Sequence, residues 1–278
     1  MRKDFQNCLL VTDLDGTFFG SGARLVQRNL DALRLFKERG GRFTVATGRI
    51  HVNVLKAFPN AAEVCNAPGI MANGSFLYDF STGMRMCENP LDARLGCEVI
   101  RFAHEVEPWA AARVSTGDGL AADSRMTNGY VDWDLDYYKG SGEIICSPME
   151  EWDLDRMRFF KIVFRGDADT LARLRPQVER RFGDKLEYCA SSPEFFELQV
   201  AGCHKGRALL GLKETLAKQY GGEWTAWAIG DYENDLPMLR AADRSACPEN
   251  AMEAVKAAVD DHVCHCNDGA IADWLERL

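Results

Sequence analysis

Residues 8–17, CLLVTDLDGT, join an apolar run directly to two carboxylates. The run from Cys8 to Val11 has the continuous apolar character of a strand that is buried on both faces of a parallel sheet. Asp13 and Asp15 follow where that strand would end, and open α/β sheets bind their ligands at this edge. These residues therefore predict a polar site at the carboxyl end of a buried parallel strand.

Strand and helix patterns alternate at both ends of the chain. Near the start, an amphipathic helix pattern stops at two glycines, residues 40–41, and a strand pattern follows at residues 43–46. Near the end, another helix pattern stops at two glycines, residues 221–222, and a strand pattern follows at residues 224–229. Repeated βαβ units of this kind predict an α/β fold with a doubly wound, Rossmann-like parallel-sheet core.

The middle of the chain has a different pattern. A helical pattern covers residues 91–106, and short alternating strand patterns follow, including residues 160–164 and 196–200. Another helical pattern, over residues 171–182, contains Pro176. Because proline lacks an N–H group and clashes with the preceding turn, we expect Pro176 to kink this helix or to move its start.

This middle segment separates the two halves of the core. We predict that residues 1–88 and 197–278 form one core domain. Residues 89–196 are predicted to form an inserted α+β domain. The sequence contains neither an internal repeat nor a low-complexity linker.

Composition and charge exclude several classes of protein. The chain has 278 residues, 46% of them hydrophobic, which is enough to bury a sizeable core. Its formal net charge is −9 and its lysines and arginines are dispersed, which disfavours a nucleic-acid partner. The N-terminal apolar run is far shorter than a signal-peptide core or a membrane span. We expect a cytoplasmic protein without a membrane partner and with mostly reduced cysteines. The sequence gives no indication of the oligomeric state.

Four carboxylates are expected to meet at the ends of two strands. Asp13 and Asp15 follow the first strand, and Asp231 and Asp235 follow the strand at residues 224–229. Their mutual repulsion in one crevice would need a cation. A site made of oxygen ligands suits Mg²⁺ far better than Zn²⁺, so Mg²⁺ is the predicted cofactor.

Donors for a phosphoryl group are expected near these carboxylates. Thr47 and the Gly48 amide follow the strand at residues 43–46, and Lys205 stands just before a predicted helix. A hydroxyl, an amide and an ammonium group can together hold phosphoryl oxygens. A carboxylate nucleophile near a bound phosphate implies an aspartyl-phosphate intermediate.

These motifs resemble those of the haloacid dehalogenase-like hydrolases, in particular the Cof-like subgroup with a type IIB cap. The four motifs are residues 13–17 (DLDGT), 46–49 (ATGR), 204–206 (HKG) and 230–235 (GDYEND). The resemblance covers the whole chain, because the motifs occur in the family's order and the insertion falls between the second and third. It implies that residues 1–88 and 197–278 are the catalytic core and that residues 89–196 are the cap domain that determines substrate specificity. One departure is the segment 246–251 (ACPENA), where many relatives have a glycine-rich AMGNA segment.

The resemblance implies roles for residues of the first three motifs. Asp13 would be the nucleophile and a metal ligand. Asp15 would be the general acid and base, and its backbone carbonyl would also bind the metal. Thr47, with the neighbouring Gly48, and Lys205 would hold the transferring phosphoryl group.

It implies roles for the later residues as well. Asp231 would bind Mg²⁺ directly, and Asp235 would support the metal directly or through another ligand. Asn234 would contact the phosphate or the substrate. The Asn73-Gly74 pair resembles a short segment of the family that leads from the core towards the cap, and we assign it to substrate binding.

The activity implied by the resemblance is Mg²⁺-dependent hydrolysis of small phosphorylated metabolites, above all sugar phosphates. Members that act on carbon–halogen bonds lack the second aspartate, so Asp15 favours phosphate esters. A phosphotransferase or phosphomutase on the same core is the alternative, since it differs only in the acceptor of the phosphoryl group. A non-catalytic sensor of phosphorylated metabolites is a third hypothesis, which the intact Asp13 and Asp15 disfavour.

Two groups of side chains in the predicted cap leave alternatives open. Trp133, Tyr137 and Tyr138 would form a lid over the substrate or part of the cap's own core, and we favour the core. A basic group would form a solvated helix face, which we favour, or meet a second anionic group on the substrate: Arg173, Arg175, Arg180, Arg181 and Lys185.

Overall fold

A computed structural model describes residues 4–278, and these residues form two compact units. The core unit contains residues 4–48, 57–87 and 204–278, and the inserted unit contains residues 49–56 and 88–203. Among the described residues, no helix is both long enough and apolar enough to cross a membrane.

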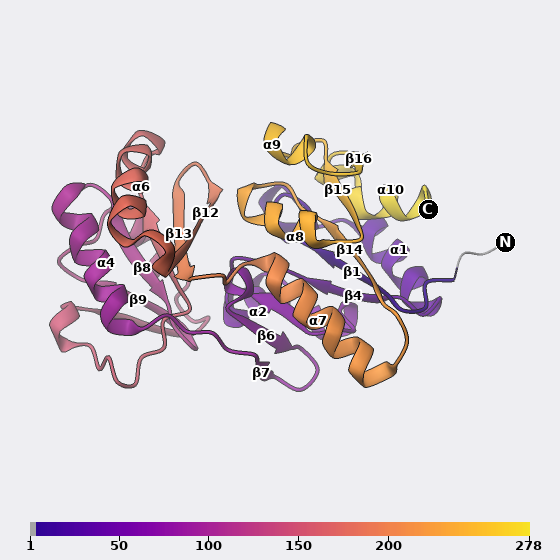
Figure 1. The fold of residues 1–278 in the computed structure, drawn as a ribbon, viewed down its shortest axis with the longest axis horizontal. Helices are drawn as coiled ribbons and strands as arrows, with labels where there is room; N and C mark the ends of the chain where they lie inside the picture. Colours follow the sequence, from indigo (N-terminus) through magenta and orange to yellow (C-terminus); the bar gives the residue numbers. More distant parts are fainter. Residues whose placement is uncertain (1–3) are drawn as a thin grey trace. The chain divides into compact units, whose positions relative to one another are not determined.

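The core unit is built on five parallel strands in the order β16-β15-β14-β1-β4 (Figure 1). These strands are β1 (Cys8–Thr12), β4 (Arg42–Val45), β14 (Thr225–Ile229), β15 (Arg244–Pro248) and β16 (Asp261–Val263). The chain runs from β1 to β4 on one side and continues through the other three strands on the opposite side. This doubly wound order confirms the predicted α/β fold class, and it places the switch point between β1 and β14.

Helices and two small sheets complete the core unit. The helices are α1 (Gln27–Glu38), α3 (Ala61–Val64), α7 (Lys205–Tyr220), α8 (Leu236–Ala241), α9 (Glu253–Lys256) and α10 (Ala270–Glu276). The small sheets are β2 (Phe19–Gly20) with β3 (Arg24–Leu25), and β5 (Gly69–Met71) with β6 (Phe76–Asp79) and β7 (Met84–Met86). The predicted apolar face of α7 is buried at Leu209, Leu212 and Leu216, whereas Tyr220 is 50% exposed.

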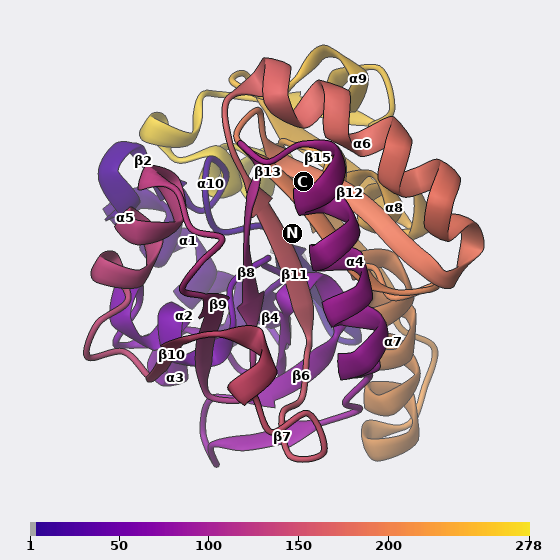
Figure 2. The same cartoon turned by 90° about the vertical axis from the view of Figure 1, so that its left-hand side faces the viewer.

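The inserted unit is built on a six-stranded sheet in the order β10-β9-β8-β11-β13-β12. Its strands are β8 (Ala111–Ser115), β9 (Gly119–Asp123), β10 (Glu143–Ser147), β11 (Lys161–Arg165), β12 (Leu186–Ser192) and β13 (Phe195–Val200). Its helices are α4 (Ala93–Val106), α5 (Gly129–Tyr137), α6 (Ala168–Phe182) and most of α2 (His51–Ala57). Helices α4 and α6 pack together on one face of the mostly antiparallel sheet, an α+β arrangement (Figure 2).

The inserted unit ends later in the chain than the sequence predicts. Strand β13 pairs with β11 and β12, so its residues belong to the inserted sheet. The assignment of residues 197–203 to the core is therefore corrected. The alternating pattern of this segment fits a strand in either unit, and only the pairing partners decide between them. Residues 49–56 and residue 88, which were also predicted to lie in the core, belong to the inserted unit as well.

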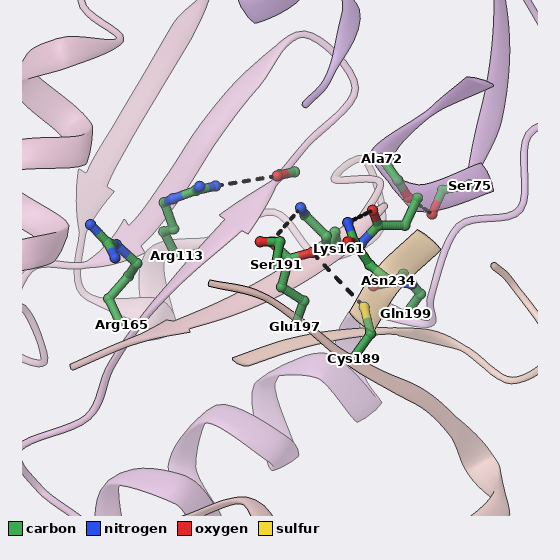
Figure 3. A network of polar contacts seen from close by, with 12 residues as sticks. Ala72, Ser75, Arg113, Lys161, Arg165, Cys189, Ser191, Glu197, Gln199 and Asn234 are labelled. Atoms are coloured by element: carbon green, nitrogen blue, oxygen red, sulfur yellow. Dashed lines mark hydrogen bonds and ion pairs between the residues drawn. The ribbon is translucent and has the colours of Figure 1, made fainter. Parts of the chain in front are cut away.

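Alternation along the strands gives the inserted sheet one apolar and one polar face. Ile162 of β11 and Leu198 of β13 belong to the apolar core on one side. On the other side, the Lys161 Nζ lies 2.9 Å from the Glu197 Oε1, and both side chains are 2% exposed (Figure 3). Ser191 also donates a hydrogen bond to Glu197. The charges that this face buries are thus paired, as burial of charge requires.

Helix α6 runs from Ala168 to Phe182 through Pro176, so the prediction that this proline moves the start of the helix is wrong. One face of this helix buries four large side chains: Leu171, Leu174, Val178 and Phe182. Burying such side chains contributes about 1.5–3 kcal/mol each, which together exceeds the roughly 3 kcal/mol that an interior proline costs. Tertiary packing therefore overrides the local preference at this position.

The aromatic residues of α5 are more exposed than the sequence predicts. Trp133 is 59% exposed and Tyr137 is 36% exposed, so neither belongs to the core of the inserted unit. Tyr138 packs partly against a small buried cluster. Helix α5 instead buries Val131 and Leu135, and our preference for a core position was wrong for Trp133 and Tyr137.

Candidate active site

The carboxyl ends of three adjacent strands carry the first predicted site residues. Asp13 follows β1 directly, Thr47 comes shortly after β4, and Asp231 comes shortly after β14. Strand β1 pairs in parallel with both β4 and β14, so the three strand ends lie at one edge of the sheet. The predicted residues therefore meet at the switch point of the core sheet, as the sequence analysis expected.

Lys205 begins α7 and is fully buried beside these carboxylates. Its Nζ lies 2.6 Å from the Asp13 Oδ1 and 2.7 Å from the Asp235 Oδ1. Burial alone would lower the pKa of the Lys205 ammonium, but the attraction of Asp13 and Asp235 outweighs burial and raises it above its ordinary value. Lys205 is therefore a fixed positive charge between two carboxylates.

Asp13, Asp231 and Asp235 approach one another closely enough to share a cation. One oxygen of each lies within 4.8 Å of the others. Burial, followed by the charge of Asp235, raises the pKa of Asp231 to about 7. Burial also raises the pKa of Asp13 well above its ordinary value, although Lys205 opposes this shift. Burial is the main cause of both shifts and the neighbouring carboxylates add to it, and a bound cation would favour the charged forms of both side chains.

The loop from Asp13 to Thr17 is shaped around Asp231. Gly16 has a φ of +85°, and a Cβ at this position would lie 2.6 Å from the Asp231 Oδ2. A glycine is therefore needed both for the turn and for the close approach. Thr17 donates a hydrogen bond from its Oγ1 to the Asp231 Oδ1 at 2.6 Å. The sequence analysis did not identify Thr17 as a site residue, although it stands in the first motif.

Asp235 organises the loop that follows β14. Its Oδ2 accepts hydrogen bonds from the backbone N–H groups of Asp231 and Tyr232 at 3.0 and 3.1 Å. Its Oδ1 faces Lys205, and the side chain is almost fully buried. Asp235 therefore fixes the positions of Asp231 and Lys205 in addition to contributing its charge.

Asn73 and Asn234 lie side by side, and Gly74 follows Asn73 in a short 3-10 turn, η2 (Ala72–Gly74). Asn234 donates a hydrogen bond from its Nδ2 to the Asn73 Oδ1 at 3.1 Å. The backbone N–H of Asn73 donates to the Thr47 carbonyl at 2.9 Å, which ties this turn to the loop after β4. Hydrogen bonds thus join the loop after β4, the η2 turn and the loop after β14.

Asp15 and Gly48 occupy the same two loops as Asp13 and Thr47. Asp15 is exposed, whereas Asp13 is 7% exposed. All the predicted site residues lie in the core unit: Asp13, Asp15, Thr47, Gly48, Asn73, Gly74, Lys205, Asp231, Asn234 and Asp235. Their catalytic and binding roles stay predictions.

Asn250 is a second residue that the sequence analysis missed. It donates a hydrogen bond from its Nδ2 to the Gly16 carbonyl at 2.8 Å, and its Oδ1 accepts one from the Cys266 N–H at 3.1 Å. Asn250 stands in the segment 246–251, which departs from the family's AMGNA pattern and was given no role in the site. Its contacts instead hold the carboxylate-bearing loop in place.

A family comparison agrees with this arrangement of fold and site. A sequence model described as haloacid dehalogenase-like hydrolase matches residues 10–275. The chain therefore belongs to the haloacid dehalogenase-like hydrolases.

Named relatives of the chain are phosphatases. The HMP-PP phosphatase of Escherichia fergusonii is 28% identical over 272 residues, which cover 96% of this chain and 94% of that protein. The HMP-PP phosphatase of Klebsiella pneumoniae is 27% identical over 276 residues, with the same coverage of 96% and 94%.

Solved structures share the whole fold. A haloacid dehalogenase-like hydrolase from Bacteroides thetaiotaomicron is 25% identical with a TM-score of 0.76, and the match covers 98% of this chain and 99% of that one. A sugar phosphatase of subclass IIB is 18% identical with a TM-score of 0.76, and the match covers 97% and 98% of the two chains. The second likeness is one of fold alone.

Proposed function

We propose that this chain is a Mg²⁺-dependent phosphatase that hydrolyses small phosphorylated metabolites through an aspartyl phosphate on Asp13. The observation that carries the proposal is the position of Lys205, which is buried against Asp13 and Asp235 beside Asp231. A fixed ammonium group among crowded carboxylates is suited to bind a phosphoryl group together with a divalent cation.

The donor set fits Mg²⁺. The carboxylates of Asp13 and Asp231 offer closely spaced oxygens, which are the ligands that Mg²⁺ prefers. We assign these two as ligands, with Asp235 in support and the backbone carbonyl of Asp15 as a further donor. When bound, Mg²⁺ would stabilise negative charge on the phosphoryl oxygens.

In the proposed first step, a carboxylate oxygen of Asp13 bonds to phosphorus as the bond between phosphorus and the leaving oxygen breaks. Asp15 donates its proton to that oxygen, so the alcohol leaves uncharged. Lys205, the Thr47 hydroxyl and the Gly48 amide hold the phosphoryl oxygens. This positioning and charge stabilisation supplies most of the catalysis in phosphoryl transfer.

In the proposed second step, water attacks the phosphorus of the acyl phosphate. Asp15, now a carboxylate, accepts a proton from the water. The bond between phosphorus and the Asp13 oxygen breaks, which releases inorganic phosphate and restores the Asp13 carboxylate. The difference in exposure supports these roles, because Asp15 reaches solvent whereas Asp13 is held inside the site.

The names of the relatives support phosphate esters and anhydrides of small molecules as substrates. The relatives act, by name, on HMP-PP, and one structural neighbour is a sugar phosphatase. We propose small phosphorylated metabolites of this kind, sugar phosphates among them, as substrates, with the inserted unit acting as the cap that selects the leaving group.

The test is phosphate release from sugar phosphates, nucleotides and an aryl phosphate, in Mg²⁺ or in EDTA. We expect metal-dependent release that falls by about a thousandfold or more in Asp13→Asn. Asp31→Asn, a change of an exposed aspartate on α1, is the matched control and should keep wild-type activity. A folded wild-type protein that binds Mg²⁺ but releases no phosphate would contradict the proposal, and transfer to a sugar hydroxyl would favour a phosphotransferase.

A further inference from the structure

The inserted unit contains a cavity of about 830 Å³ to which none of the proposed phosphatase residues contributes. This volume lies within the range of small-molecule sites. The cavity lies where β8 begins, where β11 ends and where β13 begins. Helices α5 and α6 begin at the same place.

This place is remote from the two ends of the segment 88–203, which forms most of the unit. The segment begins at residue 88, and Leu91 then pairs with Phe159, just before β11 begins. The segment ends at residue 203, just after β13 ends. The cavity therefore lies at the opposite end of these strands.

Exposed aromatic side chains line the cavity. Trp109 is 78% exposed and Trp133 is 59% exposed, although tryptophan is a residue whose burial contributes strongly to stability. Tyr130 also lines the cavity, and it precedes Trp133 by three residues on α5, so the two lie on one helical face. Exposed aromatic area around a cavity is typical of a binding surface.

The two arginines in the cavity wall pair with carboxylates of the inserted unit. The Arg165 side chain is 5% exposed, and its Nε lies 3.0 Å from the Asp134 Oδ2, a carboxylate that also pairs with Arg113. The Glu194 Oε2 lies 3.7 Å from the Arg165 Nη1 and balances the second guanidinium charge. The Arg173 Nε lies 2.8 Å from the Glu107 Oε2.

Negative charge remains available in the wall. Asp167 caps α6 by accepting a hydrogen bond from the Thr170 N–H at 2.8 Å, and it makes no ion pair with any residue of the described range 4–278. That backbone hydrogen bond, with others, lowers the pKa of Asp167, which therefore stays ionised. Glu194 is paired with Arg165, so Asp167 supplies the negative charge that the cavity wall offers to a ligand.

We propose that this cavity binds a small organic cation of the quaternary ammonium type, with Trp109 and Trp133 against the cationic group and Asp167 as its counter-charge. The faces of indole rings carry negative electrostatic potential, and they attract cations that are weakly hydrated. A carboxylate beside two such rings adds charge complementarity. This binding site is separate from the phosphate site and does not depend on the proposed phosphatase activity.

The test measures the binding of choline and of tetramethylammonium to the wild-type protein by calorimetry. The neutral alcohol 3,3-dimethylbutan-1-ol has the shape of choline without its charge and serves as the matched ligand. We expect the cations to bind at least about tenfold more tightly than the neutral alcohol. Trp133→Leu and Asp167→Asn should each weaken cation binding by about tenfold.

The variants are chosen so that the fold stays intact. Asparagine is as good a helix N-cap as aspartate, so Asp167→Asn removes charge without removing the cap. Asp169→Asn, an exposed neighbour on the same helix outside the cavity wall, should bind like the wild type. Equal binding of the neutral alcohol, unchanged binding in Asp167→Asn, or no cation binding up to millimolar concentration would overturn the proposal. Self-association that Trp133→Leu abolishes, without cation binding, would identify the surface as an interface between copies.

Discussion

Lys205 balances the negative charge of the site from a position that solvent does not reach. Its ammonium group contacts Asp13 and Asp235, and its side chain is 0% exposed. Removing the partner of a buried carboxylate leaves an uncompensated charge, which costs far more than the loss of a surface ion pair.

We expect Lys205→Gln to destabilise the protein by about 3–5 kcal/mol for this reason. Mg²⁺ should recover part of the loss, because a bound cation would replace the missing positive charge. Urea unfolding with and without Mg²⁺ measures both effects. Lys218→Gln, an exposed change on the same helix, is the control and should stay within about 0.5 kcal/mol of the wild type. A Lys205→Gln variant as stable as the wild type would refute this account of the charge balance.

Thr17 should set the affinity for the metal through its hydrogen bond to Asp231. We expect Thr17→Val to weaken Mg²⁺ binding by about 10–100-fold, because groups that orient metal ligands have effects of this size. Thr17→Ser keeps the hydroxyl and should stay close to the wild type. Titration of Mg²⁺ against phosphate release measures the change, and an unaltered Mg²⁺ affinity in Thr17→Val would show that the bond is dispensable.

The chemistry of the site made some residues predictable and left others hidden. Asp13, Lys205 and Asp231 could be predicted because each proposed role requires a particular type of residue at a motif position. These roles are the nucleophile, the positive charge and the metal ligand. Thr17 and Asn250 could not, because their partners lie more than 200 residues away in the sequence and only the fold brings them together.

The polar face of the inserted sheet depends on a buried pair between two neighbouring strands. Lys161 on β11 and Glu197 on β13 are both almost fully buried. Burial lowers the pKa of the Lys161 ammonium, although Glu197 opposes this shift. The stability of the sheet should therefore be sensitive to the loss of either charge.

We expect Glu197→Gln to destabilise the inserted unit by about 3–5 kcal/mol, since it removes the buried carboxylate charge that the Lys161 ammonium contacts. The double change Lys161→Met with Glu197→Leu should recover most of this loss, because neither charge is then buried. Asp136→Asn breaks an exposed pair with Lys139 and should cost less than about 1 kcal/mol. Thermal unfolding of the wild type and of the three variants measures these differences. A double variant no more stable than Glu197→Gln would argue against a charge effect.

Tertiary packing explains the two helices for which local sequence rules gave a wrong prediction. Pro176 is a local signal for a helix break, but the buried face of α6 keeps the helix continuous. Trp133 and Tyr137 are large aromatic residues of the kind found in protein cores, but the residues that α5 buries include Val131 and Leu135 instead. Which face of a short helix is buried depends on its neighbours, and its own sequence does not specify them.

Across the whole molecule, the strands and helices at the two ends of the chain were predictable because buried parallel strands and amphipathic helices have distinct patterns. The later boundary of the inserted unit was not predictable, because the pattern of β13 does not identify its pairing partners. The site itself lies entirely in the core unit.

Mg²⁺ should therefore act locally in the core unit. We expect it to slow hydrogen exchange in residues 13–17 and 230–235, whose backbone groups surround the carboxylates, and to leave β8 and β11 unchanged. Hydrogen exchange read by mass spectrometry, in Mg²⁺ and in EDTA, measures this difference. Protection confined to the inserted unit would place the metal elsewhere.

The most direct test of the central claim is chemical trapping of the covalent intermediate. The enzyme is mixed with a substrate that the phosphate-release assay has identified, quenched in acid during turnover, and reduced with borohydride, which converts an aspartyl phosphate to homoserine. The account predicts that peptide mass mapping finds this conversion at Asp13, and that it is absent without substrate and in Asp13→Asn. Phosphate release with Asp13 unmodified throughout turnover would contradict the account.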